Sequence, residues 1–334
     1  MAQELANDRT ERALTARPPA LMLGMMRAEE LDAAALRSLV AEALDVGVEW
    51  FDHADIYGSA WHGCEAHFGD ALQANAGARA ALKIQTKCGI VRGKSAYDLS
   101  YAHIVRQVEG SLRALRIDTI DSLLLHRPDA LCEPDEVARA FDELEASGKV
   151  RAFGVSNHTA RQIELLRGSV RQPLVVNQLQ LSLAHAPAIA QGVAANIAGE
   201  PQSVMRDDGV LDYCRTTGIA VQAWGPLQSP IAAGSFLAAP EHAALNAELS
   251  RVAAEHGVSE LEVAVAWNSR HPARPTVVLG STRPERVRAA VRGTGLPLSR
   301  GDWYGLFRAA GDQVPQSPRP SLRRDREHAR RALR

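Results

Sequence analysis

The stretch WFDHADIYG at residues 50–58 begins as an apolar strand and ends in polar side chains. Two further stretches share this pattern: ALKIQTK at 81–87 ends on a lysine, and TIDSLLLH at 119–126 ends on a histidine. In a (β/α)8 barrel, the side chains that follow the strands share the face on which catalysis takes place. The three stretches therefore predict one polar site, made of Asp52, Tyr57, Lys87 and His126.

Strand-like and helix-like runs alternate along the rest of the chain. Eight strand candidates are apolar at most positions, as is typical of strands buried on both faces; they lie at 21–25, 48–51, 81–87, 119–125, 150–155, 173–179, 218–224 and 275–280. Helical patterns separate them at 32–47, 103–116 and 135–149, and Gly47 and Gly148 stand where helix ends are expected. This alternation predicts the α/β class and a (β/α)8 TIM barrel. A doubly wound sheet is the alternative, but the sequence lacks the G-x-G-x-x-G turn of a dinucleotide-binding sheet.

Composition and charge exclude several classes of protein. The 334 residues carry a formal net charge of -1, which argues against a nucleic-acid partner, and no apolar run is long enough for a membrane span. The polar N-terminus lacks the apolar run of a signal peptide, and four scattered cysteines without a CxxC pair are typical of reduced thiols, so we expect a cytoplasmic protein. The expected division is a polar N-terminal extension at 1–19, a barrel at 20–314 and a disordered Arg-rich tail at 315–334. Nothing in the sequence indicates the oligomeric state.

The four polar residues at the strand ends are suited to protonating a carbonyl oxygen. A free phenol has a pKa of about 10, and the ammonium group of Lys87 would lower the pKa of Tyr57 by favouring the phenolate. Asp52 is the expected counter-charge for a buried lysine, and His126 can hydrogen-bond a carbonyl. Taken singly, each residue has an ordinary structural explanation, but their joint arrangement on three strand ends favours catalysis. None of them can deliver a hydride, so a nicotinamide cofactor is implied.

Several spaced motifs resemble the aldo-keto reductase family. They are FDHADIYG, TKCG, LLLHRPD, GKVRAFGVSN, NQLQLS, AWGPL and GSTRPERVRAAV, in family order across roughly residues 20–311. DHADIYG followed by CEAHFGDAL is similar to a bacterial branch of oxidoreductases in that family. The match is specific because many motifs agree and no single motif carries it.

The resemblance implies a barrel that binds NADPH without a Rossmann fold and reduces an aldehyde or ketone of a small molecule. Tyr57 would be the general acid, tuned by Lys87 and Asp52, and His126 would orient the carbonyl. The residues implied in cofactor binding are Ser156, Asn157 and Gln178 at the nicotinamide carboxamide, Trp224 on the nicotinamide ring, Gly225 and Leu227 beside it, and Gly280, Ser281, Arg283 and Arg286 near the ribose phosphate.

Some positions depart from the family pattern. Gly280 stands where many members carry a lysine, and we expect Arg283 to supply the missing charge. Ala289 and Ala290 replace the glutamate and asparagine that many members place near adenine, so we expect a differently built adenine contact. Met26 occupies a position where many relatives carry an aromatic residue.

The remaining hypotheses concern substrate and alternative functions. Segment 184–209 is too long for an ordinary connection after a strand, and we expect it to line the substrate pocket together with Trp61 and His62; an inert insertion is the alternative. The competing functions are an NADPH-binding regulatory or redox-sensing subunit and a metal-dependent hydrolase. Residues 53–64 include side chains of the types that bind metal ions. This stretch contains no HxH pair, so we predict no metal site.

Overall fold

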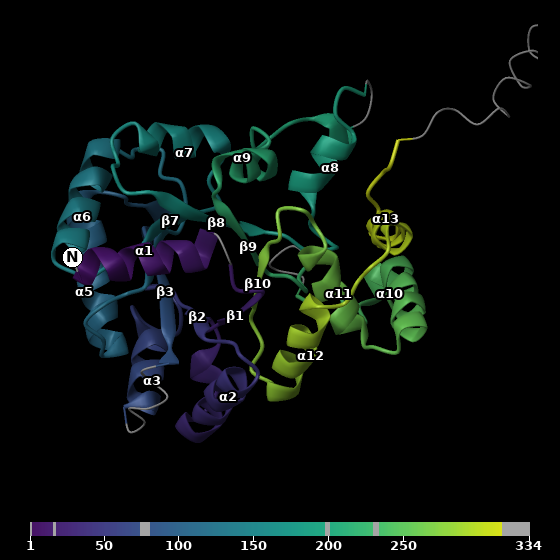
Figure 1. The fold of residues 1–334 in the computed structure, drawn as a ribbon, viewed down its shortest axis with the longest axis horizontal. Coiled ribbons are helices and arrows are strands. Elements are labelled where there is room, and N and C mark those ends of the chain that lie inside the picture. Colours follow the sequence, from purple (N-terminus) through teal and green to yellow (C-terminus); the bar gives the residue numbers. More distant parts are fainter. Residues whose placement is uncertain (1, 16–17, 74–80, 198–200, 230–233, 316–334) are drawn as a thin grey trace, which may run out of the picture.

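Eight parallel strands form a closed barrel in the computed structural model, which describes residues 2–15, 18–73, 81–197, 201–229 and 234–315 (Figure 1). The strand order is β1-β10-β9-β8-β7-β6-β3-β2. The strands are β1 (Leu21–Gly24), β2 (Trp50–Asp52), β3 (Lys83–Cys88), β6 (Ser122–Leu125), β7 (Phe153–Ser156), β8 (Leu174–Gln180), β9 (Ala220–Trp224) and β10 (Thr276–Leu279). The predicted TIM barrel and all eight strand positions are confirmed, while residues 316–334 of the expected tail lie outside the described residues.

A short antiparallel hairpin was not predicted. It consists of β4 (Ile90–Val91) and β5 (Ala96–Tyr97), which follow β3 on the carboxyl side of the barrel strands. Its two-residue strands are too short to produce a periodic pattern in the sequence. It matters for the site because it carries Arg92.

Helices connect the strands around the barrel. They are α2 (Ala33–Asp45), α3 (Gly63–Leu72), α5 (Tyr101–Leu115), α6 (Pro134–Ala146), α7 (Ala160–Arg167), α8 (Pro187–Val193), α9 (Val210–Thr217), α10 (Ala243–His256), α11 (Glu260–Ser269), α12 (Pro284–Thr294) and α13 (Arg300–Ala309), with single 3-10 turns at Ala28–Glu30, Pro201–Ser203 and Pro240–His242. The side chains of Asp32 and Ser100 cap α2 and α5 by accepting backbone N–H groups. Gly47 and Gly148 follow their helices with φ of 81° and 74°, the left-handed conformation expected there.

The N-terminal extension contains a helix, α1 (Ala2–Thr15), that lies across the strands in Figure 1. Its Leu14 is fully buried and packs with barrel residues that include Met22, Trp50 and Val176. These residues lie in the amino-terminal halves of their strands, so α1 covers the end of the barrel opposite the carboxyl ends. No helix in the described part of the chain is long and apolar enough to cross a membrane.

The parallel register brings the carboxyl ends of the strands to one face. Asp52 pairs with Gln85 across β2 and β3, and Ser156 pairs with Gln178 across β7 and β8. The barrel closes where β1 pairs with β10, aligning Leu23 with Leu279. Residues that follow β1 therefore lie next to residues that follow β10, although these two parts are far apart in the chain.

Candidate active site

The structure brings Asp52, Tyr57, Lys87 and His126 together at the carboxyl ends of β2, β3 and β6. Lys87 Nζ donates to Asp52 Oδ2 at 2.6 Å and to the backbone oxygen of His53 at 2.9 Å, and it lies 3.2 Å from the Tyr57 hydroxyl. The Tyr57 and His126 rings meet edge to face with centroids 5.9 Å apart. The phenol, the ammonium group and the imidazole thus border one small space.

A layer of three glutamines supports the carboxylate from inside the barrel. The side-chain nitrogens of Gln85 and Gln178 donate to Asp52 Oδ1 at 2.7 and 3.0 Å, and both also donate to Gln222 Oε1 at 2.8 Å. Gln222 donates back to Gln85 Oε1 at 2.9 Å. A buried carboxylate needs several donors to offset the loss of water, and this layer supplies two of them while Lys87 supplies a third.

Burial controls the protonation of the residues around Tyr57. It raises the pKa of Tyr57 above its usual value, with Lys87 opposing and Asp52 adding to the increase. Lys87 therefore offsets the desolvation of the phenol, and the net lowering of the phenol pKa that we expected does not occur. Burial also works against the charge of Lys87, but Asp52 and Tyr57 outweigh it and raise the lysine pKa. The ammonium group consequently stays charged at neutral pH.

His126 is neutral at physiological pH. Burial, followed by the charges of Lys87 and Arg127, lowers its pKa well below the usual value. Its Nδ1 atom is buried and has no hydrogen-bond partner in the part of the chain that the structure describes. A neutral imidazole can donate one N–H to a carbonyl oxygen without supplying a second positive charge.

Three of the predicted cofactor residues form a hydrogen-bonded row next to His126, whose backbone oxygen accepts from Asn157 Nδ2 at 3.3 Å. Trp224 Nε1 donates to Asn157 Oδ1 at 3.0 Å, and Asn157 Nδ2 donates to Ser156 Oγ at 2.8 Å. Asn157 has a φ of 60°, a left-handed conformation that asparagine tolerates better than most residues and that is concentrated at functional sites. The row fixes the Trp224 ring, and the Arg127 guanidinium lies 6.0 Å from the ring centroid.

Gly225 and Leu227, also predicted beside the nicotinamide, follow β9. Gly225 has a φ of 62°, and its oxygen accepts from the backbone of Gln228 at 2.9 Å. Leu227 accepts from the backbone of Phe236 at 3.0 Å and is partly buried against the core. Gln178 is tied to Asp52 and Gln222 through its side-chain nitrogen, so its side-chain oxygen is the atom left for a carboxamide.

Three arginines gather where β1 and β10 end. Arg283 and Arg286 lie at the start of α12, directly after the buried Ser281. Arg27, from the loop after β1, donates a hydrogen bond to the backbone oxygen of Gly280. Burial lowers the pKa of Arg286, and the charges of Arg283 and Arg27 lower it further. An anion bound here would relieve this repulsion, so the residues present fit a phosphate group.

The structure adds residues that sequence reasoning missed. The first is Arg27. From the sequence, its place beside Arg283 and Arg286 could have been inferred only from the pairing of β1 with β10 that closes the barrel. The second is Arg92 on the β4–β5 hairpin, which donates to the backbone oxygens of Ile56 at 2.6 Å and Gly58 at 2.8 Å. These two carbonyls flank Tyr57, so Arg92 fixes the backbone on both sides of the phenol.

Trp61 and His62 lie in the loop before α3, and segment 184–209 follows β8 and includes α8. His62 Nδ1 lies 2.6 Å from Glu65 Oε2, and its ring faces α5, while Trp61 is 37% exposed beside His103. Helix α8 of the segment lies on the opposite side of the barrel from α3, which follows His62 (Figure 1). A role for segment 184–209, Trp61 and His62 in the substrate pocket stays a prediction.

A closed parallel barrel with polar, ionisable groups at the carboxyl ends of its strands defines the class of (β/α)8 barrel enzymes. Within that class, the chain belongs to the aldo/keto reductase family, whose pattern it matches over residues 20–305. The resemblance seen in the motifs is thereby confirmed, and the protein is an oxidoreductase of this family.

Relatives of known sequence and structure agree with this assignment. The chain is 37% identical to the uncharacterized oxidoreductase YcsN of Bacillus subtilis, with 84% of this chain and 90% of YcsN covered. It is 36% identical to a 6-dehydroglucose reductase of Agrobacterium fabrum, with coverage of 82% and 87%. The structure of an aldose reductase from Giardia lamblia superimposes with a TM-score of 0.67 at 21% identity over 91% of this chain and 96% of that one, which supports the fold.

Proposed function

We propose that the protein reduces an aldehyde or ketone of a small molecule to the alcohol with NADPH as hydride donor. The observation that carries this proposal is the Tyr57 hydroxyl, placed 3.2 Å from a buried ammonium group that is itself paired with Asp52. A phenol in this position can give up its proton because the neighbouring charge stabilises the phenolate left behind. The name of the Agrobacterium fabrum relative, a reductase, supports the same direction of reaction.

The residues around the site fit the cofactor at both of its ends. Ser156, Asn157 and the side-chain oxygen of Gln178 would hold the nicotinamide carboxamide, and Trp224 would lie against the ring. At the other end, the arginines after β1 and β10 together with Ser281 would hold the 2′-phosphate that distinguishes NADPH from NADH. When bound, the cofactor supplies the hydride that no side chain of this group can supply.

The protein's own residues would handle the carbonyl oxygen. Neutral His126 would donate a hydrogen bond that holds the oxygen in place, and Tyr57 would transfer its proton to that oxygen as negative charge develops there. Lys87 would stabilise the resulting phenolate, and the glutamine layer would keep Asp52 oriented toward Lys87. Arg92 would hold the Tyr57 backbone in the position that this proton transfer requires.

The proposal is tested with Tyr57→Phe in an NADPH oxidation assay over aldehydes, ketones, quinones and sugars. We expect turnover to fall by about 10²–10⁴-fold, the usual contribution of general acid catalysis, with NADPH affinity nearly unchanged. Tyr213→Phe is a matched control, because Tyr213 lies on α9 and its hydroxyl bonds to Glu164 at the surface. Turnover of Tyr57→Phe equal to that of the control would refute the assignment. Tight NADPH binding without turnover of any carbonyl in the wild-type protein would instead favour a regulatory subunit.

A further inference from the structure

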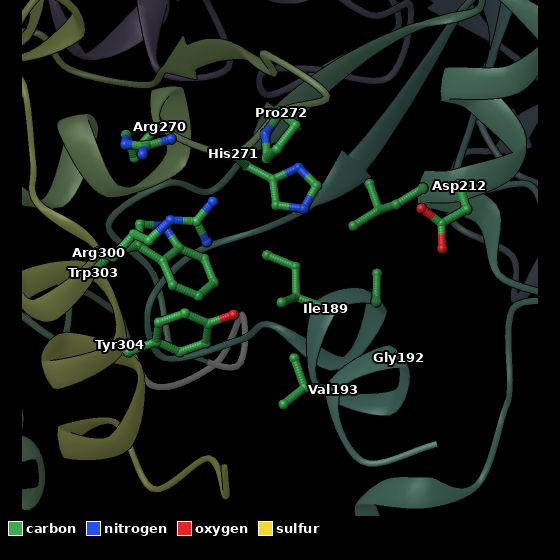
Figure 2. A pocket seen from close by; sticks show the side chains of 12 residues that line it. Ile189, Gly192, Val193, Asp212, Arg270, His271, Pro272, Arg300, Trp303 and Tyr304 are labelled. Carbon is green, nitrogen blue, oxygen red and sulfur yellow. The ribbon is translucent and has the colours of Figure 1, made fainter. Parts of the chain in front are cut away.

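A hollow lies among helices of the barrel exterior (Figure 2). Its volume is about 350 Å³, and it lies between α8, α9, the turn after α11 and the start of α13. We call it the flank pocket. It is lined by Ala188, Ile189, Gly192, Val193, Leu211, Asp212, Arg270, His271, Pro272, Arg300, Trp303 and Tyr304, none of which belongs to the residues around Tyr57.

The base of the flank pocket is apolar and rigid. Ile189 and Leu211 are buried, and Trp303 is 9% exposed. The Trp303 ring stacks on Trp267 with centroids 5.0 Å apart and an interplanar angle of 7°, and the two indoles exchange N–H bonds to each other's backbone oxygens. Tyr304 meets Trp303 edge to face at 4.9 Å. A preformed aromatic surface of this kind suits the flat or aliphatic body of a ligand.

The polar groups of the flank pocket favour an anion. The Arg300 guanidinium extends toward His271, and the Tyr304 hydroxyl turns toward the open space (Figure 2). Neither group has a hydrogen-bond or ion-pair partner in the described ranges. Asp212, the acidic residue of the lining, forms an ion pair with Arg215; Asp212 Oδ1 and Arg215 Nη1 lie 3.3 Å apart. The pocket thus presents a free cation and a free hydroxyl, among the described residues, above an apolar base.

His271 contributes no charge to the flank pocket. Burial lowers its pKa to about 4, and its Nδ1 atom accepts from the backbone of Ala273 at 3.1 Å. Arg270, the other cation of the lining, donates to the backbone oxygen of Leu298 at 3.1 Å. Arg300 is therefore the lining cation with no protein partner in the part of the chain that the structure covers.

We propose that the flank pocket binds a small organic anion, with a carboxylate on Arg300 and the Tyr304 hydroxyl and an apolar body against Trp303 and Ile189. The volume lies within the range of about 300–1,000 Å³ that small-molecule sites occupy. The site is formed in part by α8, within the segment 184–209 that sequence analysis placed at the substrate pocket. None of its lining residues is among those proposed for proton transfer or cofactor binding, so the two proposals are tested separately.

Gly192 offers a variant that closes the pocket without disturbing the fold. A Cβ built there meets nothing within 4 Å, and the residue has ordinary helical geometry in α8. Gly192→Leu would extend its side chain into the flank pocket, and leucine favours a helix more than glycine does. Arg300→Gln removes the charge of an exposed residue at the start of α13 while keeping hydrogen-bonding capacity.

The test is isothermal titration of the full chain with 2-naphthoate and with the neutral 2-naphthalenemethanol as probes. We expect 2-naphthoate to bind about tenfold more tightly than the alcohol. A hydrogen bond to a charged group typically changes affinity by about that factor. Arg300→Gln should remove this preference, and Gly192→Leu should abolish binding of both probes. Arg167→Gln, which changes an exposed arginine on α7, should alter neither.

The outcomes separate the flank pocket from the catalytic site. Absence of binding to the wild-type protein, or equal affinity of wild type, Gly192→Leu and Arg300→Gln, would overturn the proposal. Tyr57→Phe should bind 2-naphthoate as the wild type does, and loss of binding there would place the probe in the catalytic site instead.

Discussion

Replacing Asp52 by asparagine tests how the group of Asp52, Tyr57, Lys87 and His126 is held together. The exposed fractions of the Lys87 and Asp52 side chains are 1% and 3%, and their charged atoms lie 2.6 Å apart. The new side-chain amide would keep an oxygen for Gln85 and Gln178, but it would turn an N–H toward the Lys87 ammonium group. Removing one partner of a buried ion pair costs about 3–5 kcal/mol, a large share of the roughly 5–15 kcal/mol that stabilises a typical domain.

The loss is measured as the free energy of unfolding in urea at pH 7, beside a matched control. Asp70→Asn removes an equivalent charge from the Asp70–Arg116 pair, whose side chains are 61% and 46% exposed. Exposed pairs contribute about 0–1 kcal/mol, so the control should lie within that range of the wild type. The double variant Asp52→Asn with Lys87→Met should recover part of the loss, because no unpaired ammonium group remains buried.

The pH dependence supplies an independent check. In the wild type, the Lys87 pKa is raised, so its contribution to stability is fully present below the unfolded pKa of about 10.4 and is lost as pH rises through the folded pKa. Without Asp52, burial should lower the folded pKa below the unfolded one, and the unfolded chain should then bind more protons. The stability of Asp52→Asn should therefore increase as the pH rises toward the unfolded lysine pKa. A variant that loses less than about 1 kcal/mol and shows no such increase would refute this account of the ion pair.

The remaining predictions concern the cofactor, the Tyr57 backbone and a second buried carboxyl group. Arg286→Ala should raise the NADPH dissociation constant about tenfold or more and leave the NADH dissociation constant nearly unchanged. Both constants are measured by fluorescence titration. Equal weakening of the two cofactors would show that Arg286 does not bind the 2′-phosphate. Arg92→Ala should lower kcat more than it changes cofactor affinity, with Arg92→Lys retaining more activity than the alanine; unchanged kcat in both would exclude positioning of Tyr57. Burial, with the Glu65 charge adding to it, raises the Asp55 pKa to about 8, so the folded state holds a proton that the unfolded chain releases near pH 4. Stability should thus fall between those two pH values, and Asp55→Asn should reduce this slope in unfolding measurements at each pH; an unaltered slope would contradict the assigned protonation.

Local sequence patterns determined the barrel and the residues of its proposed catalytic site. Runs of apolar residues alternating with amphipathic ones specify strands buried on both faces and helices that cover them, and this signal needs no knowledge of the tertiary contacts. Because side chains that follow parallel strands share one face, Lys87 and His126 could be grouped with Tyr57 from the sequence alone. The motifs around them were enough to indicate the family.

Only the tertiary structure decided what surrounds these residues. The charge of Arg27 lowers the pKa of Arg286 because the barrel closes between β1 and β10. Three glutamines from β3, β8 and β9 converge at Asp52 and at one another because they point into the same interior layer. The direction of the Tyr57 pKa shift depends on burial, which a sequence does not display. Helix α8 lies beside α9 and borders a hollow that residues of α13 also line, which its sequence did not indicate. Contacts between distant parts of a chain depend on closure and packing, whereas the periodic patterns that reveal strands and helices are local.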